Sequence, residues 1–317
     1  MRALVTGGAG FIGSNLVDAL LDRGDEVAVV DDLSTGRREN LEGALHRGGV
    51  LHEADIRDAP RLREVFVRAR PDIVFHLAAQ MDVRRSIEDP AFDAGINVLG
   101  TINVLEAARA SGVRRVINTS TGGAIYGEVD VMPTPESVTP KPMAAYGQSK
   151  FCAEAYCGWF ERLHGLSSVT LRYGNVYGPR QDPQGEAGVI AIFAGRLLAG
   201  EQPTIYGDGR QTRDYTYVGD IVAANLAAAA HPEAHGAYNV GTGVESSVLE
   251  ILAALRAAAG VPEQDFEPRF APGRKGELQR SSLDVTRARA ELGFTADTDL
   301  VSGMKSTLDW ARASVAS

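Results

Sequence analysis

The glycine-rich turn near the start of the chain constrains the fold more than any other stretch. Residues 3–5 form a short apolar run typical of a buried parallel strand, and residues 15–21 have the spacing of a helix that ends at Gly24. Four glycines separate these two elements: Gly7, Gly8, Gly10 and Gly13. Glycines here allow a tight turn, close approach of a pyrophosphate and close packing of helix on strand. The turn therefore predicts a dinucleotide site at the helix N-terminus, where free N–H groups bind phosphate.

An acidic pair follows the second apolar run. Residues 27–30 end at Asp31 and Asp32, which lie about 20 residues after the glycines, as in a dinucleotide-binding unit. A carboxylate at this place hydrogen-bonds an adenosine ribose and repels the 2′-phosphate of NADP. The alternative is an ordinary turn with a solvated acidic pair. Because strand, glycines, helix and acid come in the required order, the sequence predicts NAD as the cofactor.

Strand and helix patterns alternate along most of the chain. Apolar runs predict further strands near 52–56, 73–77, 115–120, 168–173 and 238–240, and helical patterns cover 62–70, 91–110, 146–164 and 218–230. This alternation predicts an α/β fold with a Rossmann-type doubly wound parallel sheet.

The alternation weakens after Asn175, where glycine and proline become frequent. We expect residues 1–175 plus 216–244 to form an NAD-binding Rossmann domain. Residues 176–215 and 245–317 are expected to form a smaller C-terminal substrate-binding lobe. Ligands of such sheets bind at the carboxyl ends of the strands, so we expect this lobe to lie there.

A tyrosine and a lysine carry the second chemical signal. Tyr146 and Lys150 lie at i and i+4 of a predicted helix, so their side chains share one face. A free tyrosine has a pKa of about 10, which a neighbouring lysine and a positively charged nicotinamide ring lower. Ser120 and Thr121 follow the preceding strand and can bridge the phenol to a substrate hydroxyl. The alternative is a surface pair, but this place in a nucleotide-binding sheet favours a catalytic base.

Charge and hydropathy limit the partners. The net charge of −9 argues against nucleic acid and anionic membranes. No apolar run reaches the roughly 18 residues that span a bilayer, and the N-terminus shows no signal-peptide pattern. Cys152 and Cys157 are the only cysteines, and they face different sides of a predicted helix, so we expect neither a disulfide nor a metal site. We therefore expect a cytoplasmic protein.

Further motifs make the chain resemble a known enzyme family. The matching stretches are TGGAGFIG at 6–13, DDLSTG at 31–36, DIR at 55–57, HLAA at 76–79, NVLGT at 97–101, Y-x-x-x-K at 146–150, RYGN at 172–175, RDY at 213–215 and RKGE at 274–277. Over nearly its whole length the chain is similar to the extended short-chain dehydrogenase/reductases and, among them, to the UDP-glucose (UDP-galactose) 4-epimerases. The resemblance implies an NAD-dependent epimerase that inverts C4 of a UDP-hexose through a transient 4-keto intermediate, with Tyr146 as the base.

The resemblance also implies the binding residues. Those expected to bind the cofactor are Gly7, Gly10, Phe11, Ile12, Gly13, Asp31, Asp32, Ser34, Thr35, Gly36, Asp55, Ile56, Leu77, Ala78, Ala79, Gln80, Asn97, Thr119, Tyr146, Lys150, Tyr173 and Val176. Those expected to bind the UDP-sugar are Thr121, Tyr146, Asn175, Gly188, Val189, Tyr206, Arg213, Arg274, Glu277 and Ser281. In such epimerases the residue at the place of Ser281 controls the space around the sugar's 2-substituent, so a serine there implies that N-acetylated sugars fit.

Some positions depart from the family pattern. Counted back from Tyr126 the catalytic hydroxyl falls on Gly122, whereas counted back from Tyr146 it falls on Thr121. We therefore expect Thr121 as the catalytic hydroxyl, with Ser120 as the alternative. Met81 stands where many members have a lysine, and Glu277 replaces a usual aspartate.

Several alternatives stay open. The substrate is alternatively UDP-N-acetylglucosamine, UDP-glucuronate or dTDP-glucose. A nucleotide-sugar dehydratase commonly has an acidic pair after the active-site threonine, where this chain has Gly122 and Gly123. A reductase is a further alternative. A regulator that senses NAD without chemistry is not expected to keep both Tyr146 and Lys150.

Two predicted helices, 91–110 and 146–164, are more apolar than one covered face requires. Pairing them across a two-fold axis buries the excess in a four-helix bundle, as in related epimerases. We therefore expect a homodimer, with burial inside one protomer as the alternative.

Overall fold

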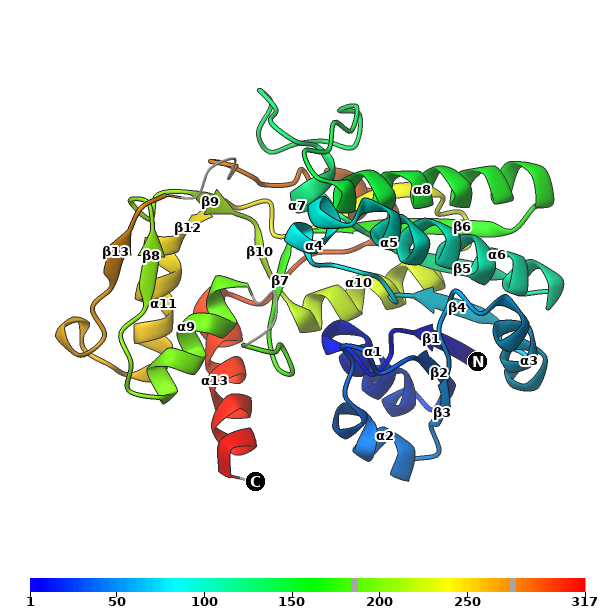
Figure 1. Cartoon of the computed structure of the whole chain (residues 1–317), viewed down its shortest axis with the longest axis horizontal. Helices are drawn as coiled ribbons and strands as arrows, with labels where there is room; N and C mark the ends of the chain where they lie inside the picture. The colour runs from blue at the N-terminus through cyan, green and yellow to red at the C-terminus, as the bar shows by residue number, and fades with distance from the viewer. Residues whose placement is uncertain (184–187, 274–277, 317) are drawn as a thin grey trace.

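A seven-stranded sheet forms the centre of the structure, a computed structural model that describes residues 1–183, 188–273 and 278–316 (Figure 1). Its strands are β1 (Arg2–Thr6), β2 (Glu26–Asp31), β3 (Val50–Glu53), β4 (Ile73–His76), β5 (Arg115–Thr121), β6 (Ser167–Tyr173) and β11 (Gly236–Val240). All neighbours pair in parallel in the order β11-β6-β5-β4-β1-β2-β3. The strand order therefore reverses between β1 and β4, and the predicted doubly wound α/β fold is confirmed.

Two apolar cores cover the two faces of the sheet, because successive residues of a strand point to opposite faces. On one face Val5 packs in a core with residues of α1 (Phe11–Asp22) and α10 (Val218–Ala230). On the other face Leu4 packs in a core with residues of α3 (Ala59–Ala69), α6 (Thr101–Ala110) and α8 (Ala145–His164). Burial on both faces explains why the strands appear in the sequence as nearly continuous apolar runs.

The third strand lies earlier in the chain than predicted. β3 covers Val50–Glu53 instead of 52–56. The last ladder-like bond beyond it runs from the Ala54 amide to the Asp31 carbonyl, 3.1 Å away. The Asp55 carboxylate then accepts the Arg57 amide at 2.8 Å, which turns the chain out of the sheet. Asp55 and Ile56 therefore follow the strand and stand at the same edge as the other predicted binding residues.

The predicted helix 91–110 is not a regular α-helix. It consists of α5 (Pro90–Ala94), a π-helical segment η2 (Gly95–Gly100) and α6. Asp89 caps the N-terminus of α5 by accepting the Phe92 amide at 2.9 Å. Periodicity could not reveal the π turn, because the apolar spacing hardly changes over a single wide turn.

A smaller lobe lies beside the carboxyl edge of the sheet, on the left of Figure 1. Its core is formed mainly by three helices, α9 (Val189–Leu198), α11 (Val248–Ala259) and α13 (Leu300–Ala316). Short strand pairs complete it: β7 (Asn175–Tyr177) with β10 (Tyr215–Tyr217), β8 (Thr204–Tyr206) with β13 (Arg269–Ala271), and β9 (Thr212–Arg213) with β12 (Ser246–Ser247). We propose that residues 1–175 and 216–244 form the NAD-binding domain and that residues 176–215 and 245–317 form the substrate-binding lobe.

The remaining elements are short. They are η1 (Arg38–Leu41), α2 (Glu42–His46), α4 (Val83–Glu88), α7 (Gly122–Ile125), η3 (Glu263–Asp265) and α12 (Thr286–Leu292). Within the described ranges, none of the helices combines the length and apolarity needed to cross a membrane.

Candidate active site

The glycine turn sits tightly against the carboxyl edge of the sheet. Gly7 has a φ of +70°, and a Cβ there would lie 2.6 Å from the backbone nitrogen of Ala78, which follows β4. A Cβ on Gly13 would lie 2.1 Å from the Gly7 carbonyl oxygen. Both positions therefore exclude any side chain, and the turn brings the predicted segment 77–80 beside the start of α1.

The N-terminus of α1 offers a place for a pyrophosphate. Gly10 is its N-cap and has no side chain to cap the helix, so this residue leaves the amides of the first turn, at Phe11, Ile12 and Gly13, without a side-chain cap. A helix N-terminus with glycines at the point of approach is a ready anion site. These residues fit the dinucleotide that the sequence predicts.

Asp31 organises the end of β2. Its Oδ2 accepts the amide of Ala9 and its Oδ1 the amide of Leu33, both at 2.9 Å. Burial raises the pKa of Asp31, whereas the two amides lower it. A carboxylate has about four lone-pair positions, so acceptor capacity remains for a ribose. Asp32 is exposed and binds only locally, accepting the amide and hydroxyl of Ser34 at 3.0 and 2.6 Å.

The other expected adenosine contacts surround Asp31. A Cβ on Gly36 would lie 2.8 Å from the Asp31 Oδ1, so this glycine lets the loop close on the carboxylate. Thr35 is exposed beside it. Across the edge, Asp55 forms an ion pair with Arg57, Nη2 to Oδ2 2.5 Å. Ile56 is buried.

The segment after β4 is tied to the helix at Asn97. The amide of Gln80 donates to Asn97 Oδ1, and Asn97 Nδ2 donates back to the Gln80 carbonyl, both at 2.9 Å. The Ala78 amide donates to Thr6 Oγ1 at 3.2 Å, which fixes the strand that precedes the glycine turn. Leu77 and Ala79 lie in the same segment. Met81, at the place of the family's lysine, is 58% exposed.

The predicted base stands at the start of α8. Gly147 packs on α7, since a Cβ there would lie 2.4 Å from the Ala124 carbonyl oxygen. This contact holds Tyr146 beside Thr121, the N-cap of α7. Burial raises the pKa of Tyr146 to about 12, and hydrogen bonding by the Thr121 hydroxyl opposes that rise. Burial lowers the pKa of Lys150 to about 8.

The two candidate hydroxyls differ in their surroundings. Thr121 interacts with the Tyr146 phenol, whereas the buried Ser120 Oγ has no hydrogen-bond partner among the described residues. The geometry therefore favours Thr121 as the partner of Tyr146, in line with the expectation from the sequence.

The nicotinamide side is formed by strand ends. The Tyr173 hydroxyl lies 3.2 Å from Thr119 Oγ1 and accepts a bond from Asn225 Nδ2 at 2.7 Å. Burial raises the pKa of Tyr173 to about 12. Val176 follows in β7 and is half-buried. These two residues thus lie where the sheet meets the smaller lobe.

The expected substrate residues come from the smaller lobe and the strands that lead to it. Asn175 starts β7, and its Oδ1 lies 3.1 Å from the place of a Cβ on Gly123. Arg213 is half-buried in β9 and donates to the Thr212 carbonyl at 2.7 Å. Tyr206 ends β8 and is 41% exposed. The further positions are Gly188, the N-cap of α9, Val189, its first residue, and the half-buried Ser281.

Arg274 and Glu277, also expected to bind UDP, lie outside the described residues.

Comparison with known proteins decides the family. The family model for NAD-dependent epimerases and dehydratases matches residues 3–241, from β1 to β11. The chain belongs to this NAD-dependent epimerase/dehydratase family. Membership confirms the resemblance found in the sequence, the enzyme class and NAD as the cofactor.

Curated relatives of this family member match it over almost their full lengths. The UDP-glucose 4-epimerase of Mycolicibacterium smegmatis is 47% identical, over 98% of this chain and 99% of its own. A putative UDP-glucose 4-epimerase of Methanocaldococcus jannaschii is 42% identical, over 98% of both chains. A dTDP-glucose 4,6-dehydratase of Actinoplanes is 34% identical, over 99% of this chain and 98% of its own.

Solved structures agree. The UDP-glucose 4-epimerase of Thermotoga maritima with UDP-glucose is 45% identical, with a TM-score of 0.93 over 99% of this chain and 100% of its own. The Thermus thermophilus UDP-glucose 4-epimerase with NAD is 45% identical, with a TM-score of 0.90 over 98% of this chain and 99% of its own.

Sequence reasoning missed three buried polar groups of this epimerase/dehydratase site. His76 lies between Thr6 Oγ1 at 2.7 Å and Thr101 Oγ1 at 3.0 Å, and burial lowers its pKa to about 3. The other two are Asp93 and the pair Glu154–Arg172. Asp93 lies four residues before Asn97, and Lys150 lies four residues before Glu154, so each pair shares one face of a predicted helix. This spacing is the sequence signal that points to Asp93 and Glu154.

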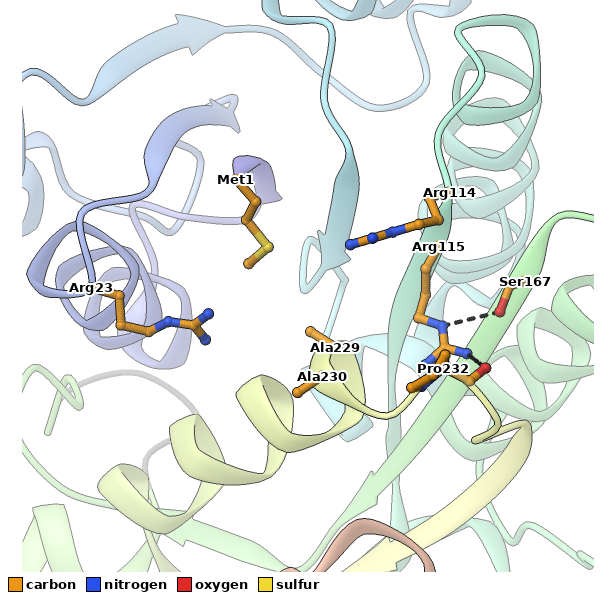
Figure 2. A pocket seen from close by; sticks show the side chains of 8 residues that line it. All are labelled: Met1, Arg23, Arg114, Arg115, Ser167, Ala229, Ala230 and Pro232. Carbon is orange, nitrogen blue, oxygen red and sulfur yellow. Dashed lines mark hydrogen bonds between the residues drawn. The ribbon is translucent and has the colours of Figure 1, made fainter.

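A cavity of about 380 Å³ lies at the opposite, amino-terminal edge of the sheet (Figure 2). Arg115, which starts β5, uses all its N–H groups there: Nε donates to Ser167 Oγ, and the two terminal nitrogens donate to the carbonyls of Ala228, His231, Pro232 and Ala234. Arg115 therefore secures the chain at the end of α10. None of the residues that line the cavity belongs to the candidate active site. They are Met1, Arg23, Arg114, Arg115, Ser167, Ala229, Ala230 and Pro232.

Proposed function

We propose that this protein is a UDP-glucose 4-epimerase, which interconverts UDP-glucose and UDP-galactose through a 4-keto intermediate. Two lines of evidence support the proposal. Relatives and solved structures that carry this name match the chain over its full length at 45–47% identity. Thr121, at the carboxyl end of β5, also hydrogen-bonds Tyr146, and Lys150 follows one helical turn later on α8.

The glycine pair after Thr121 carries the choice of reaction within the family. A Cβ on Gly122 would lie 2.5 Å from Leu283 Cδ1, and one on Gly123 would lie 3.1 Å from Asn175 Oδ1. An acidic pair at these two places, which a dehydratase commonly has, would require the Leu283 and Asn175 side chains to move. Without an acid to protonate the leaving C6 hydroxyl, water elimination is disfavoured, whereas epimerisation needs only one base.

Tyr146 moves the proton in this reaction. Its phenolate takes the proton of the substrate 4-hydroxyl, and the resulting phenol later returns it, with Thr121 orienting the hydroxyl. NAD, when bound, accepts and returns the C4 hydride and supplies a positive charge in its oxidised form. Because burial raises the Tyr146 pKa to about 12, ionisation near neutral pH needs nearby positive charge, and the Lys150 ammonium is the protein's contribution to it.

Inversion also requires that the 4-ketose turn over inside the site. The site must therefore hold the nucleotide diphosphate firmly and the hexose loosely. Arg213 is expected to contact the diphosphate, since a guanidinium forms paired, charge-assisted bonds with phosphate oxygens. Asn175 and Tyr206 are expected to assist. We extend the substrate range to N-acetylated UDP-hexoses because Ser281 is small.

We also infer that the protein forms a homodimer through the helices at 90–110 and 145–164. Large apolar side chains remain exposed on them: Leu99, Tyr156, Trp159 and Leu163. Leu163→Glu with Leu99→Glu is expected to give monomers in sedimentation velocity. Val67→Glu, at a residue 71% exposed on α3, is the matched control and is expected to leave the dimer intact. A wild type that sediments as a monomer contradicts the inference.

Incubation of the purified protein with a panel of UDP- and dTDP-hexoses, without added NAD, tests the proposed reaction. We expect UDP-glucose and UDP-galactose to reach the same mixture from either side. A 4-keto-6-deoxy product would instead identify a dehydratase. Bound NAD without turnover of any sugar nucleotide would identify an NAD-sensing protein.

A further inference from the structure

Asn97, in the π-helical turn η2, and Asp93, in the preceding helix α5, lie in segments that pack beside α8. Asn97 Nδ2 donates to Ser149 Oγ and to Asp93 Oδ1, both at 3.1 Å. Ser149 lies on α8 between Tyr146 and Lys150, and its hydroxyl donates to the Tyr146 carbonyl at 3.0 Å. The segment that carries Asp93 is therefore in contact with the helix that carries the candidate base.

The Asp93 carboxylate is buried and only partly paired. The residue is fully buried, with 0% exposure. Its Oδ1 accepts bonds from Gln80 Nε2 at 2.9 Å and from Asn97 Nδ2. Its Oδ2 is buried and accepts no hydrogen bond from the described residues. An unpaired buried carboxylate oxygen is costly, so the structure favours a positive group close to it.

Lys150 is the matching group on α8. It is 3% exposed, and the structure gives its ammonium no hydrogen bond or ion pair among residues 1–183, 188–273 and 278–316. We propose, on the basis of the proposed function, that Asp93 is a positioning residue for Tyr146 and Lys150. Its negative charge keeps Lys150 charged and opposes the ionisation of Tyr146 through space. This assigns a role to a residue outside the family motifs of the chain.

The electrostatics agree with this geometry. Burial is the largest influence on both groups, and the negative charge of Asp93 raises the pKa of Tyr146 and also that of Lys150. Glu154 and Cys157 act on Lys150 as well, but Glu154 is paired with Arg172. His76, on β4, is neutral because burial lowers its pKa to about 3. On α4, Arg85 stacks on Phe92, 3.8 Å from the ring centroid.

Loss of the Asp93 charge should lower the pKa values of both Tyr146 and Lys150. Removal of the Asp93 charge makes the phenolate easier to form and the ammonium easier to lose, so both pKa values fall. The acid and alkaline limits of epimerisation should therefore move together toward lower pH. Because the titrations of Tyr146 and Lys150 are coupled, each limit of the pH profile reports the pair of residues and not one residue alone.

Asp93→Asn is the sharpest variant, since the amide oxygen can still accept from Gln80 and Asn97 while the charge is lost. In the pH profile of kcat/KM for the purified enzyme with its bound cofactor, we expect both limits to shift by about one unit to lower pH. Glu88→Gln removes one charge at an exposed site on α4 and is expected to leave the profile unchanged. Unshifted limits in Asp93→Asn overturn the proposal, as does an equal shift in Glu88→Gln.

A second measurement does not depend on activity. Proteins labelled with ¹³Cζ-tyrosine give a Tyr146 signal that the Tyr146→Phe variant identifies. At about pH 10, near the pKa of free tyrosine, Asp93→Asn should show a larger ionised fraction of Tyr146 than the wild type. If Asp93→Asn fails to fold, Asp93→Ser serves in its place. An unchanged fraction refutes the role of Asp93, whereas absence of any epimerisation by the wild type refutes only the proposed function.

Discussion

The Arg172 guanidinium lies 2.6 Å from the Glu154 carboxylate, and the two side chains are only 6% and 8% exposed. Arg172 also donates to the Tyr126 hydroxyl at 2.8 Å, and that hydroxyl donates to Asn239 Oδ1 at 2.8 Å. The network thus ties α8 to β6, to the end of α7 and to β11. It holds the helix of Tyr146 against the sheet.

Removal of one partner should therefore be costly. We expect Glu154→Ala to lower the free energy of unfolding by about 3–5 kcal/mol, because it leaves the Arg172 charge buried and unpaired. Urea denaturation followed by circular dichroism measures this. Glu106→Ala breaks the exposed Glu106–Arg109 pair on α6 and should change stability by less than about 1 kcal/mol. Equal losses in the two variants contradict the assignment of a buried structural pair.

Tyr146→Phe should abolish most turnover while the fold and bound NAD are retained. The phenylalanine lacks the hydroxyl that we propose as the base for the 4-hydroxyl proton, so we expect kcat to fall at least about 100-fold. Tyr156→Phe on the same helix, at a residue 38% exposed, is the matched control and should behave like the wild type. Near-normal turnover in Tyr146→Phe shows that the base lies elsewhere.

Three variants distinguish Thr121 from Ser120 as the catalytic hydroxyl. Thr121→Val keeps the side-chain shape and loses the hydroxyl, so kcat should fall by about 100-fold, the cost of one positioned hydrogen-bond group. Thr121→Ser should restore activity. Ser120→Ala removes a buried hydroxyl that has no partner among the described residues and should be neutral or slightly stabilising. The reverse pattern would assign the catalytic role to Ser120.

Asp31 should control the cofactor. We expect the purified wild type to release NAD and not NADP on denaturation, because a buried carboxylate repels a 2′-phosphate. Asp31→Asn replaces one of the two oxygens that accept the Ala9 and Leu33 amides, so NAD binding and stability should both weaken, the latter by about 1–3 kcal/mol. Glu39→Gln removes one charge at an exposed site on η1 and serves as the control. Release of NADP from the wild type would rule out this account.

Local pattern made most of the fold predictable. The strand at residues 2–6, the glycines and Asp31 follow one another within a single βαβ unit, so their spacing alone indicates the dinucleotide site. Tyr146 and Lys150 are likewise neighbours on one helix. Parallel strands bring their carboxyl ends to one edge, which is why residues distant in sequence could be assigned to one site.

Contacts between distant segments could not be predicted. Arg172 on β6 pairs with Glu154 on α8, and nothing in the spacing of the two residues along the sequence indicates that the pair is buried. The environment of Asp93 depends on contacts with Gln80 and Asn97, and Asn97 lies in a π turn that leaves the apolar pattern nearly unchanged. Leu283 packs against Gly122 from the C-terminal part of the chain, so this contact is visible only in three dimensions.

Ser281 should decide whether N-acetylated sugars are accepted. Ser281 is half-buried two residues before Leu283, which packs on Gly122 beside Thr121, the proposed catalytic hydroxyl, so its segment borders the expected hexose site. The segment is held in place, because the Thr134 amide donates to the Ser282 carbonyl at 2.9 Å. A tyrosine at 281 adds a ring of aromatic bulk beside the sugar, whereas serine leaves room for an acetamido group to turn with the ketose.

The test compares kcat/KM for UDP-glucose and UDP-N-acetylglucosamine in the wild type and in Ser281→Tyr. We expect the wild type to epimerise both sugars and the variant to lose the acetylated one by at least about 100-fold, since a buried clash costs several kcal/mol while the glucose reaction needs no space there. Ser281→Ala is the control for loss of the hydroxyl and should keep both activities. If the wild type rejects UDP-N-acetylglucosamine, or if Ser281→Tyr still accepts it, Ser281 does not control the space around the 2-substituent of the sugar.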